Sequence, residues 1–349
     1  PKGDAVEFVQ ARREAGRSDA EVRVEIERLA AAALIYAPGP SAENEGAGLP
    51  RVFLPGGARN VRITEAAREL GALLSVKETV FVRGGALVRI EGGPDQEPAL
   101  VQVKPAELTS IFETVADLHT TVASQGGVFE KQRNCSKHAA ECIAPCQEFL
   151  GQLPKLRLLT RCPVLDEEAG QLVVVQGYHR PTGVYAAGGA VEQVPFAEAC
   201  ELLRDLIVDF RFASPGDRSR ALAGIITPAL VQGGLLKGRA PLDLGESDSS
   251  QTGKSYRVRL SAAVYNDRPR VVTQREKGVG SMEESLSMAL IRGASFISLD
   301  NVRGLLSSPG LESALTEDFF SARGPYVQPV DIDMRPVVIL LTSNRAELT

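Results

Sequence analysis

The sequence lacks any apolar run long enough to cross a membrane. No stretch of its 349 residues approaches the roughly 18 apolar residues that a membrane-spanning helix needs. The chain also does not open with the charged, apolar and small-residue segments of a secretory signal. We therefore expect a soluble, cytoplasmic protein with no membrane partner.

The sequence also lacks an excess of basic residues and a cysteine framework. Its formal net charge of -5 argues against a broad basic surface that coats nucleic acid, although a narrow basic loop or channel stays open. Five cysteines are an odd number, which favours reduced thiols. Cys135, His138, Cys142 and Cys146 have the spacing of one helical stripe, and such a stripe does not easily surround a tetrahedral ion. Buried or half-buried thiols are therefore favoured over zinc.

Apolar periodicity and turn residues divide the chain into successive parts. Helical spacing over residues 4–33 is broken at Gly16, and Ser18 is placed to cap a second helix. The chain begins with Pro1 and ends at Thr349, shortly after a strongly apolar run, so we expect both ends to be cut. The predicted parts are a helical tail of a preceding domain (1–37), a linker (38–50), a small helix-plus-hairpin module (51–104), a mainly helical connecting region (105–194) and a C-terminally truncated ATPase core (195–349).

The strongest motif lies between Pro241 and Ser261, where a short apolar strand is followed by a polar loop and then by Gly253-Lys254-Ser255 at the start of a helix. In such a loop the backbone N–H groups and the helix N-terminus bind phosphates, a lysine reaches the terminal phosphates and a serine hydroxyl holds Mg²⁺. Lys254 and Ser255 fit these two roles. The expected nucleotide contacts are Gly245, Ser250, Gln251, Thr252, Gly253, Lys254, Ser255 and Tyr256.

The loop departs from the usual motif at one position. The first glycine normally lies five positions before the second, and Asp248 occupies that place here, while the nearest upstream glycine is Gly245. Either the loop is longer by a few residues, or an acidic residue weakens phosphate binding by repulsion.

Two further apolar runs end in polar residues. Ala294–Asn301 predicts a buried strand that delivers the Asp300 carboxylate to magnesium, with a simple turn cap as the alternative. Pro336–Asn344 predicts another strand whose last side chain contacts the attacking water or the terminal phosphate. A strand candidate at 270–273 lies between the first two motifs, as ATPases of the additional-strand class require. Together these features predict an α/β fold, a P-loop NTPase core preceded by α+β accessory modules.

On these motifs, residues 150–349 resemble the superfamily 3 helicases and the related AAA+ ATPases in primase-helicase proteins of phages, plasmids and integrated elements. The resemblance is carried by the runs Ile297–Thr316, Arg323–Asn344 and Asp209–Leu230. Pro1–Phe8 is weakly similar to the tail of a toprim primase domain.

The resemblance implies roles for individual residues. Lys254 and Ser255 would bind ATP and Mg²⁺, Asp300 would bind Mg²⁺, and Asn344 would act as the sensor. Asn301 stands where many relatives have a second acidic residue, and an amide is no general base at neutral pH, so either another acid helps or hydrolysis is slow. The arginine finger of such proteins has no match here and is expected beyond Thr349.

The resemblance also implies an activity and partners. We expect an ATP-driven DNA helicase or translocase, a homo-oligomer, such as a hexamer, with single-stranded DNA in its channel. Arg323 and Arg335 would contact DNA from a hairpin before the sensor strand, although Asp331 and Asp333 keep a solvated turn as the alternative. Two other readings stay open: a nucleotide-binding scaffold with weak catalysis, and an AAA+ ATPase that remodels protein.

Overall fold

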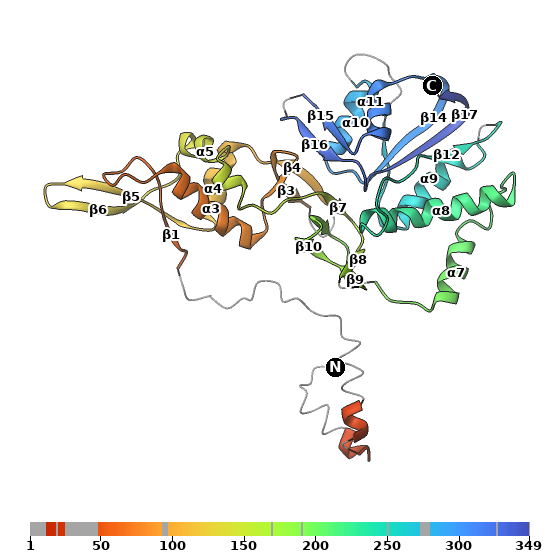
Figure 1. Cartoon of the computed structure of the whole chain (residues 1–349), viewed down its shortest axis with the longest axis horizontal. Coiled ribbons are helices and arrows are strands. Elements are labelled where there is room, and N and C mark those ends of the chain that lie inside the picture. The colour runs from red at the N-terminus through yellow and green to blue at the C-terminus, as the bar shows by residue number, and fades with distance from the viewer. Residues whose placement is uncertain are drawn as a thin grey trace. The chain divides into compact units, whose positions relative to one another are not determined.

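The structure is a computed structural model that divides into two compact units, Pro1–Ala47 and Gly48–Thr349 (Figure 1). It describes residues 12–18, 20–24, 48–92, 97–168, 170–189, 191–249, 251–272, 280–325 and 327–348. In the first unit, Gly16 has a φ of 80° and ends a helical turn. Ser18 Oγ accepts a hydrogen bond from the N–H of Glu21, whose carboxylate accepts one from Ser18 N at 2.9 Å. The predicted helix break and cap are therefore confirmed.

The second unit begins with the predicted helix and hairpin. β1 (Arg51–Phe53) leads to α3 (Ile63–Lys77), and β2 (Phe81–Arg83) pairs antiparallel with β3 (Ala86–Glu91). Gly84 and Gly85 both have positive φ, as a tight hairpin turn requires. A further strand that was not expected, β4 (Ala99–Gln102), pairs with β3.

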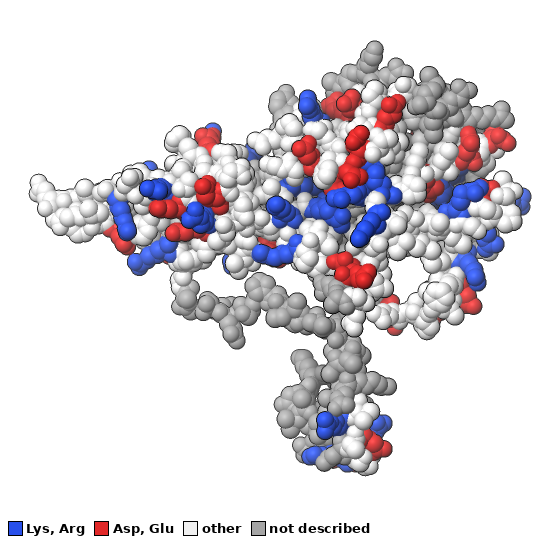
Figure 2. All heavy atoms as spheres, in the orientation of Figure 1, with Lys and Arg blue, Asp and Glu red and all other residues white. Residues whose placement is uncertain are grey.

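The expectation of a mainly helical region over 105–194 is wrong. Its helices are short, and strands occupy more of the described residues. A hairpin of two long strands, β5 and β6, is exposed along all of its second strand and carries the apolar side chains Val122, Val128 and Phe129 near its uncharged tip (Figure 2). A strand that is exposed on both faces has no alternating pattern to reveal it. The elements are η1 (Pro105–Glu107), α4 (Leu108–Glu113), β5 (Asp117–Ser124), β6 (Gly127–Gln132), α5 (Lys137–Ile143), α6 (Gln147–Leu150), β7 (Leu158–Thr160), β8 (Val164–Glu168), β9 (Gln171–Val175), β10 (Gly177–His179) and β11 (Val184–Ala186).

The cysteines of this region do not share one helix. Cys135 precedes α5 and is buried, whereas Cys146 caps α6. Only His138 and Cys142 lie together on α5, with Nε2 and Sγ 3.8 Å apart. All five cysteines are free thiols, and among the described residues no group of three or more His, Cys, Asp or Glu side chains is placed to hold a metal ion.

The C-terminal part is a mixed α/β fold around a four-stranded parallel sheet. The strand order is β12-β17-β14-β13, so the first and last strands of the sheet in sequence are neighbours. The elements are α7 (Phe196–Asp205), α8 (Pro215–Gln232), β12 (Asp243–Glu246), α9 (Lys254–Ala263), β13 (Arg270–Val271), α10 (Met282–Ile291), β14 (Phe296–Leu306), α11 (Pro309–Thr316), β15 (Phe319–Ala322), β16 (Val330–Asp333) and β17 (Val338–Leu348).

Helices cover both faces of this sheet (Figure 1). Alternate residues of each strand point to opposite faces. Ile297 and Ile339 belong to the core formed with α10, α11 and the β15–β16 hairpin. Phe296 and Leu340 pack instead with α8 and α9. These strands are continuous apolar runs in the sequence because both faces of the sheet are buried.

The strands of the second and third motifs do not end at their polar residues. β14 continues past Asp300 to Leu306, and β17 continues past Asn344 to Leu348. The pairing shifts by one residue between Leu299 and Val302 of β14, so that Asp300 and Asn301 together lie opposite Thr342. This is a β-bulge, and Asn301 occupies it with a φ of 58°.

Candidate functional site

The loop between β12 and α9 wraps around the ammonium group of Lys254. Nζ donates to Ser247 Oγ at 2.6 Å, to the Ser249 carbonyl at 3.0 Å and to Thr252 Oγ1 at 3.1 Å. Asn344 Oδ1 on β17 lies 2.8 Å from Nζ as well, so four acceptors share its three N–H donors. Gly253 precedes the helix with a φ of 87°, a conformation in which glycine carries no strain. The lysine is thus held in the centre of a strand–loop–helix unit, surrounded by oxygen atoms.

Ser255 and Asp300 meet on the same side of the sheet. Ser255 Oγ, in the first turn of α9, donates to Asp300 Oδ1 at 2.7 Å. Thr342 Oγ1, on the neighbouring strand β17, donates to the same carboxylate oxygen at 2.6 Å. One oxygen of Asp300 therefore receives two hydroxyl groups, which fixes the rotamer of the carboxylate.

The bulge in β14 is held by side chains of β17. The backbone N–H of Asn301 donates to Thr342 Oγ1 at 2.6 Å, and Asn344 Nδ2 donates to Asn301 Oδ1 at 3.0 Å. Asn344 therefore bridges Asn301 and Lys254 through the two ends of its amide. Lys254, Ser255, Asp300, Asn301, Thr342 and Asn344 are called the loop-end cluster below.

The other described residues that were expected to contact nucleotide lie around this cluster. Gln251 is in the left-handed region with a φ of 62°, and Tyr256 is exposed in the first turn of α9. Gly245 lies on β12, where a Cβ would come within 3.2 Å of the guanidinium of Arg257. Ser250 lies outside the described residues, and Asp248 is exposed.

Sequence reasoning missed Thr342 and the ion pair beneath the loop. Arg257 forms a bidentate pair with Asp243, at 2.7 and 2.9 Å, which ties α9 to β12. A charged residue in each of the two elements was visible in the sequence, but neither position carried a signal for pairing. Thr342 stands in the run that predicted the sensor strand, two residues before Asn344 and hence on the same face. That spacing was the available signal.

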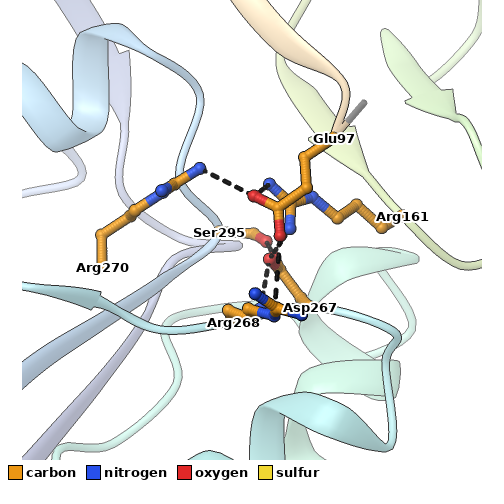
Figure 3. A network of polar contacts seen from close by, with 6 residues as sticks. All are labelled: Glu97, Arg161, Asp267, Arg268, Arg270 and Ser295. Carbon is orange, nitrogen blue, oxygen red and sulfur yellow. Dashed lines mark hydrogen bonds and ion pairs between the residues drawn. The ribbon is translucent and has the colours of Figure 1, made fainter. Parts of the chain in front are cut away.

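A second polar cluster lies beyond the C-terminal end of α9 and at the start of β14. Asp267 follows α9, and its carboxylate accepts a hydrogen bond from Ser295 Oγ, just before β14, at 2.6 Å. Arg161 contacts Asp267 at 3.1 Å and Glu97 at 3.0 Å, and both Arg161 and Asp267 are nearly buried. Figure 3 shows Arg268 and Arg270 converging on the same Glu97. The arginine network below means Glu97, Arg161, Asp267, Arg268, Arg270 and Ser295.

Two titratable side chains, Glu97 in the arginine network and Cys162 beside Arg161, have shifted pKa values. The hydrogen bond from Arg161 is the main cause that lowers the pKa of Glu97, and the charges of Arg161, Arg270 and Arg268 lower it further. Burial, with a smaller effect of the Asp267 charge, raises the pKa of the Cys162 thiol to about 11. Cys162 is therefore a thiol and not a thiolate at neutral pH, which makes it a poor nucleophile.

A cavity of about 1070 Å³ connects the two clusters. Its lining includes Ser255 and Asp300 at one end and Glu97, Arg161 and Asp267 at the other. It is open to solvent along α9. A volume of this size accommodates a ligand of nucleotide size or a side chain from another molecule.

The hairpin expected to contact DNA is present as β15 and β16, which pair antiparallel. Arg323 follows β15 and is exposed. Arg335 instead forms a bidentate ion pair with Asp333, at 2.7 and 2.9 Å, and its guanidinium lies over the ring of Phe319. A DNA contact by either residue stays a prediction, and Arg323 is the better placed of the two.

The β15–β16 hairpin is also hydrogen-bonded to the sheet of β2, β3 and β4. Gln328 in its loop exchanges two hydrogen bonds with the side chain of Gln102 on β4, at 3.0 and 3.1 Å. The N–H of Asp331 on β16 donates to the carbonyl of Gly84 at 3.3 Å. Motion of this hairpin would therefore break these hydrogen bonds or displace β3 and β4 with it.

Comparison with known proteins gives remote matches. No family model matches the chain, and no curated protein matches it. Two solved structures of the NrS-1 C-terminal region in its apo form are similar. The first has 12% identity and a TM-score of 0.33, over 71% of this chain and 58% of its own. The second has 9% identity and a TM-score of 0.35, over 80% of this chain and 61% of its own. A chain described as the SCCmec type IV Cch active helicase has 13% identity and a TM-score of 0.29, over 76% of this chain and 50% of its own.

The chain thus spans between half and about three fifths of the length of the solved chains it matches. At TM-scores this low the matches carry no argument about mechanism, which depends on the geometry of the loop-end cluster.

No helix in the described part of the chain is both long and apolar enough to span a bilayer.

Proposed function

We propose that this chain is a P-loop ATPase core of the kind that drives DNA helicases and translocases. The observation that carries the proposal is the convergence of Lys254, Ser255 and Asp300 around the start of α9, with Asn344 from the adjacent strand. These side chains come from segments up to 90 residues apart. Phosphoryl transfer depends mainly on positioning and on charge stabilisation, and this set supplies a cation, metal ligands and a polar sensor.

The residues present fit ATP with Mg²⁺. Ser255 and Asp300 offer hard oxygen donors within 2.7 Å of each other, which suits Mg²⁺ held by one or two protein ligands together with phosphates. Bound Mg²⁺ would neutralise charge on the terminal phosphates. Lys254 would exchange its bonds to the loop oxygens for bonds to phosphate, and the N–H groups of the first turn of α9 would donate to phosphate as well.

The chain's own side chains would order the site. Thr342 and Ser255 hold the Asp300 carboxylate in one rotamer, and Asn344 connects Lys254 with Asn301. The order of the strands supports this reading, because β17 and β14 bring Asn344 and Asp300 next to the loop that follows β12.

Lys254→Ala tests the assignment directly. We expect ATP hydrolysis to fall by roughly 100-fold or more, because the cation at the terminal phosphates is lost. Phosphate release measures turnover, and circular dichroism checks that the variant is folded. A folded variant that hydrolyses ATP as fast as the parent would remove Lys254 from the phosphate site.

A nucleotide-binding scaffold with weak catalysis is the second candidate, and Asn301 favours it. Asn301 stands beside Asp300, where a second acid would serve as the base, and its amide is bonded to Asn344. Asn301→Asp separates the two candidates. An ATPase limited by this position would become faster, whereas a scaffold would bind ATP with no turnover before and after the change.

DNA as the substrate of the motor is part of the same proposal. The exposed Arg323, in a hairpin attached to β4, is the feature of this chain that supports it. Single-stranded DNA should stimulate hydrolysis by the parent, and Arg323→Ala should weaken the stimulation with basal turnover unchanged. Stimulation by an unfolded protein and not by DNA would instead favour a protein remodeller.

A further inference from the structure

Three aromatic rings gather beside the phosphate-binding loop. Phe210 and Phe212 lie just before α8, and Tyr256 is in the first turn of α9. The ring centroid of Phe210 is 6.1 Å from that of Tyr256 and 6.2 Å from that of Phe212, with interplanar angles of 31° and 35°. The tyrosine is 60% exposed. Three rings with similar orientation thus form a partly open apolar surface.

The surface is continuous with the loop. A Cβ on Gly253 would lie 3.4 Å from Cε1 of Phe210, so the ring covers the backbone at the start of α9. Tyr256 comes two residues after Lys254 and one residue after Ser255. The N–H groups of this turn have no partners within the helix and face the position of the phosphates.

A nucleotide base is tied to its phosphates by one ribose. A base attached to phosphates at the start of α9 can therefore reach only a short distance, and the ring of Phe210 lies against Gly253 at that start. Aromatic rings bind bases by stacking, whichever base is offered, because every base has a π face. The base is the part of a nucleotide that is neither charged nor a sugar, so apolar rings beside a phosphate site are suited to bind it.

We propose that Phe210 and Tyr256 form the stacking surface for the base of the bound nucleoside triphosphate, with Phe212 supporting Phe210. The inference rests on the proposed ATPase function and assigns a site for the base within it. It makes the segment before α8 a part of the nucleotide site.

The experiment compares two ligands, Mg-ATP and Mg-tripolyphosphate, on the full 349-residue chain. Calorimetry measures the affinity of the parent and of Phe210→Ala and Tyr256→Ala for each ligand. We expect each variant to bind ATP roughly tenfold more weakly, and to bind tripolyphosphate within about twofold of the parent. Tyr256→Phe should restore ATP binding, because it keeps the ring.

The controls separate the possible failures. Lys254→Ala should weaken both ligands, and Phe196→Ala, at an 85% exposed phenylalanine on α7, should change neither. Equal weakening of both ligands in the ring variants would mean that the rings only shape the loop, and unchanged ATP affinity would mean that the base binds elsewhere. Either result overturns the stacking surface. A parent that binds neither ligand would instead contradict the proposed function.

If Phe210→Ala does not fold, Phe210→Leu replaces it. Leucine keeps apolar volume against Gly253 but offers no ring. The same selective loss of ATP affinity is expected for it, and no selective loss would again overturn the stacking surface.

Discussion

The two ends of α9 carry polar clusters with opposite characters, one beside the middle of β14 and the other beside its start. At one end the loop-end cluster is partly exposed and opens into a cavity, and its lysine is bonded to four loop and strand oxygens. At the other end Arg161 and Asp267 are nearly buried and pair with each other. Helix α9 thus has one end suited to a ligand and one end fixed to the preceding part of the chain.

This difference separates function from stability. Functional groups are often held in arrangements that do not maximise stability, whereas buried ion pairs are costly to break. Variants at the first end should change turnover more than unfolding, and variants at the second should do the reverse. The following predictions test that contrast.

The largest effect is expected for Asp300→Asn. The shape of the side chain and its acceptor oxygen are kept, but the negative charge that would hold Mg²⁺ is lost. We expect ATP turnover to fall roughly 100- to 1000-fold, with the free energy of unfolding changed by less than about 1 kcal/mol. Phosphate release and urea denaturation measure the two quantities. A large loss of stability would show that Asp300 is mainly structural.

Asp267→Ala should have the opposite profile. It leaves the nearly buried Arg161 with the more exposed Glu97 as its carboxylate partner and removes the bond to Ser295, so we expect a loss of about 3 kcal/mol in the free energy of unfolding. Nucleotide affinity should stay within about threefold when measured below the unfolding transition. As a control, Arg161→Met in the Asp267→Ala background should recover part of the loss, since it removes a nearly buried charge that has lost one of its two carboxylate partners.

Thr342→Val should give an intermediate effect on both quantities. Valine has the shape of threonine but cannot donate to Asp300 or accept from the N–H of Asn301. We expect turnover to fall about tenfold and stability to fall by 1–2 kcal/mol, roughly the cost of an unsatisfied buried N–H. Thr342→Ser keeps the hydroxyl and should behave like the parent. A serine variant as slow as the valine variant would mean that packing, not hydrogen bonding, matters here.

Glu97→Gln should have the smallest effect. Glu97 is partly exposed, so its pairs with three arginines are screened, and we expect a loss below about 1 kcal/mol at neutral pH. Its pKa is lowered in the folded state, so its contribution is present above the pKa of the unfolded chain and disappears as the pH falls below about 4. The difference between parent and variant should therefore shrink on acidification. A difference that grew at low pH would contradict the direction of the shift.

The motifs of the sheet were predictable, because each was a local pattern. Buried runs at 294–301 and 336–344 predicted β14 and β17, and Gly253-Lys254-Ser255 predicted the start of α9. The strand candidate at 270–273 predicted β13, which occupies 270–271, but β13 lies at the edge of the sheet, and the strand between β12 and β14 is β17. The meeting of Lys254, Asp300 and Asn344 was expected from these motifs, and the structure brings them together. Their roles in catalysis stay predictions.

What could not be predicted depends on contacts between distant segments. Arg161 and Asp267 are more than 100 residues apart, and nothing near either one indicates the other. The continuation of β14 and β17 past their motifs comes from their pairing with each other, because residues after Asp300 have no strong strand pattern of their own. The β5–β6 hairpin was missed because its exposed strand has no apolar face.

The extra residue in β14 shifts which side chains of the strand face the core. Ile297 and Leu299 reach one core layer with the spacing of two that an ordinary strand has, whereas Val302 reaches the same layer after a step of three. Removing Asn301 would leave the ordinary spacing of two between Leu299 and Val302, so Val302 would keep its layer and only the bulge would be lost. The bulge therefore accommodates one extra residue beside Asp300 without moving Val302 out of the core layer that Leu299 occupies.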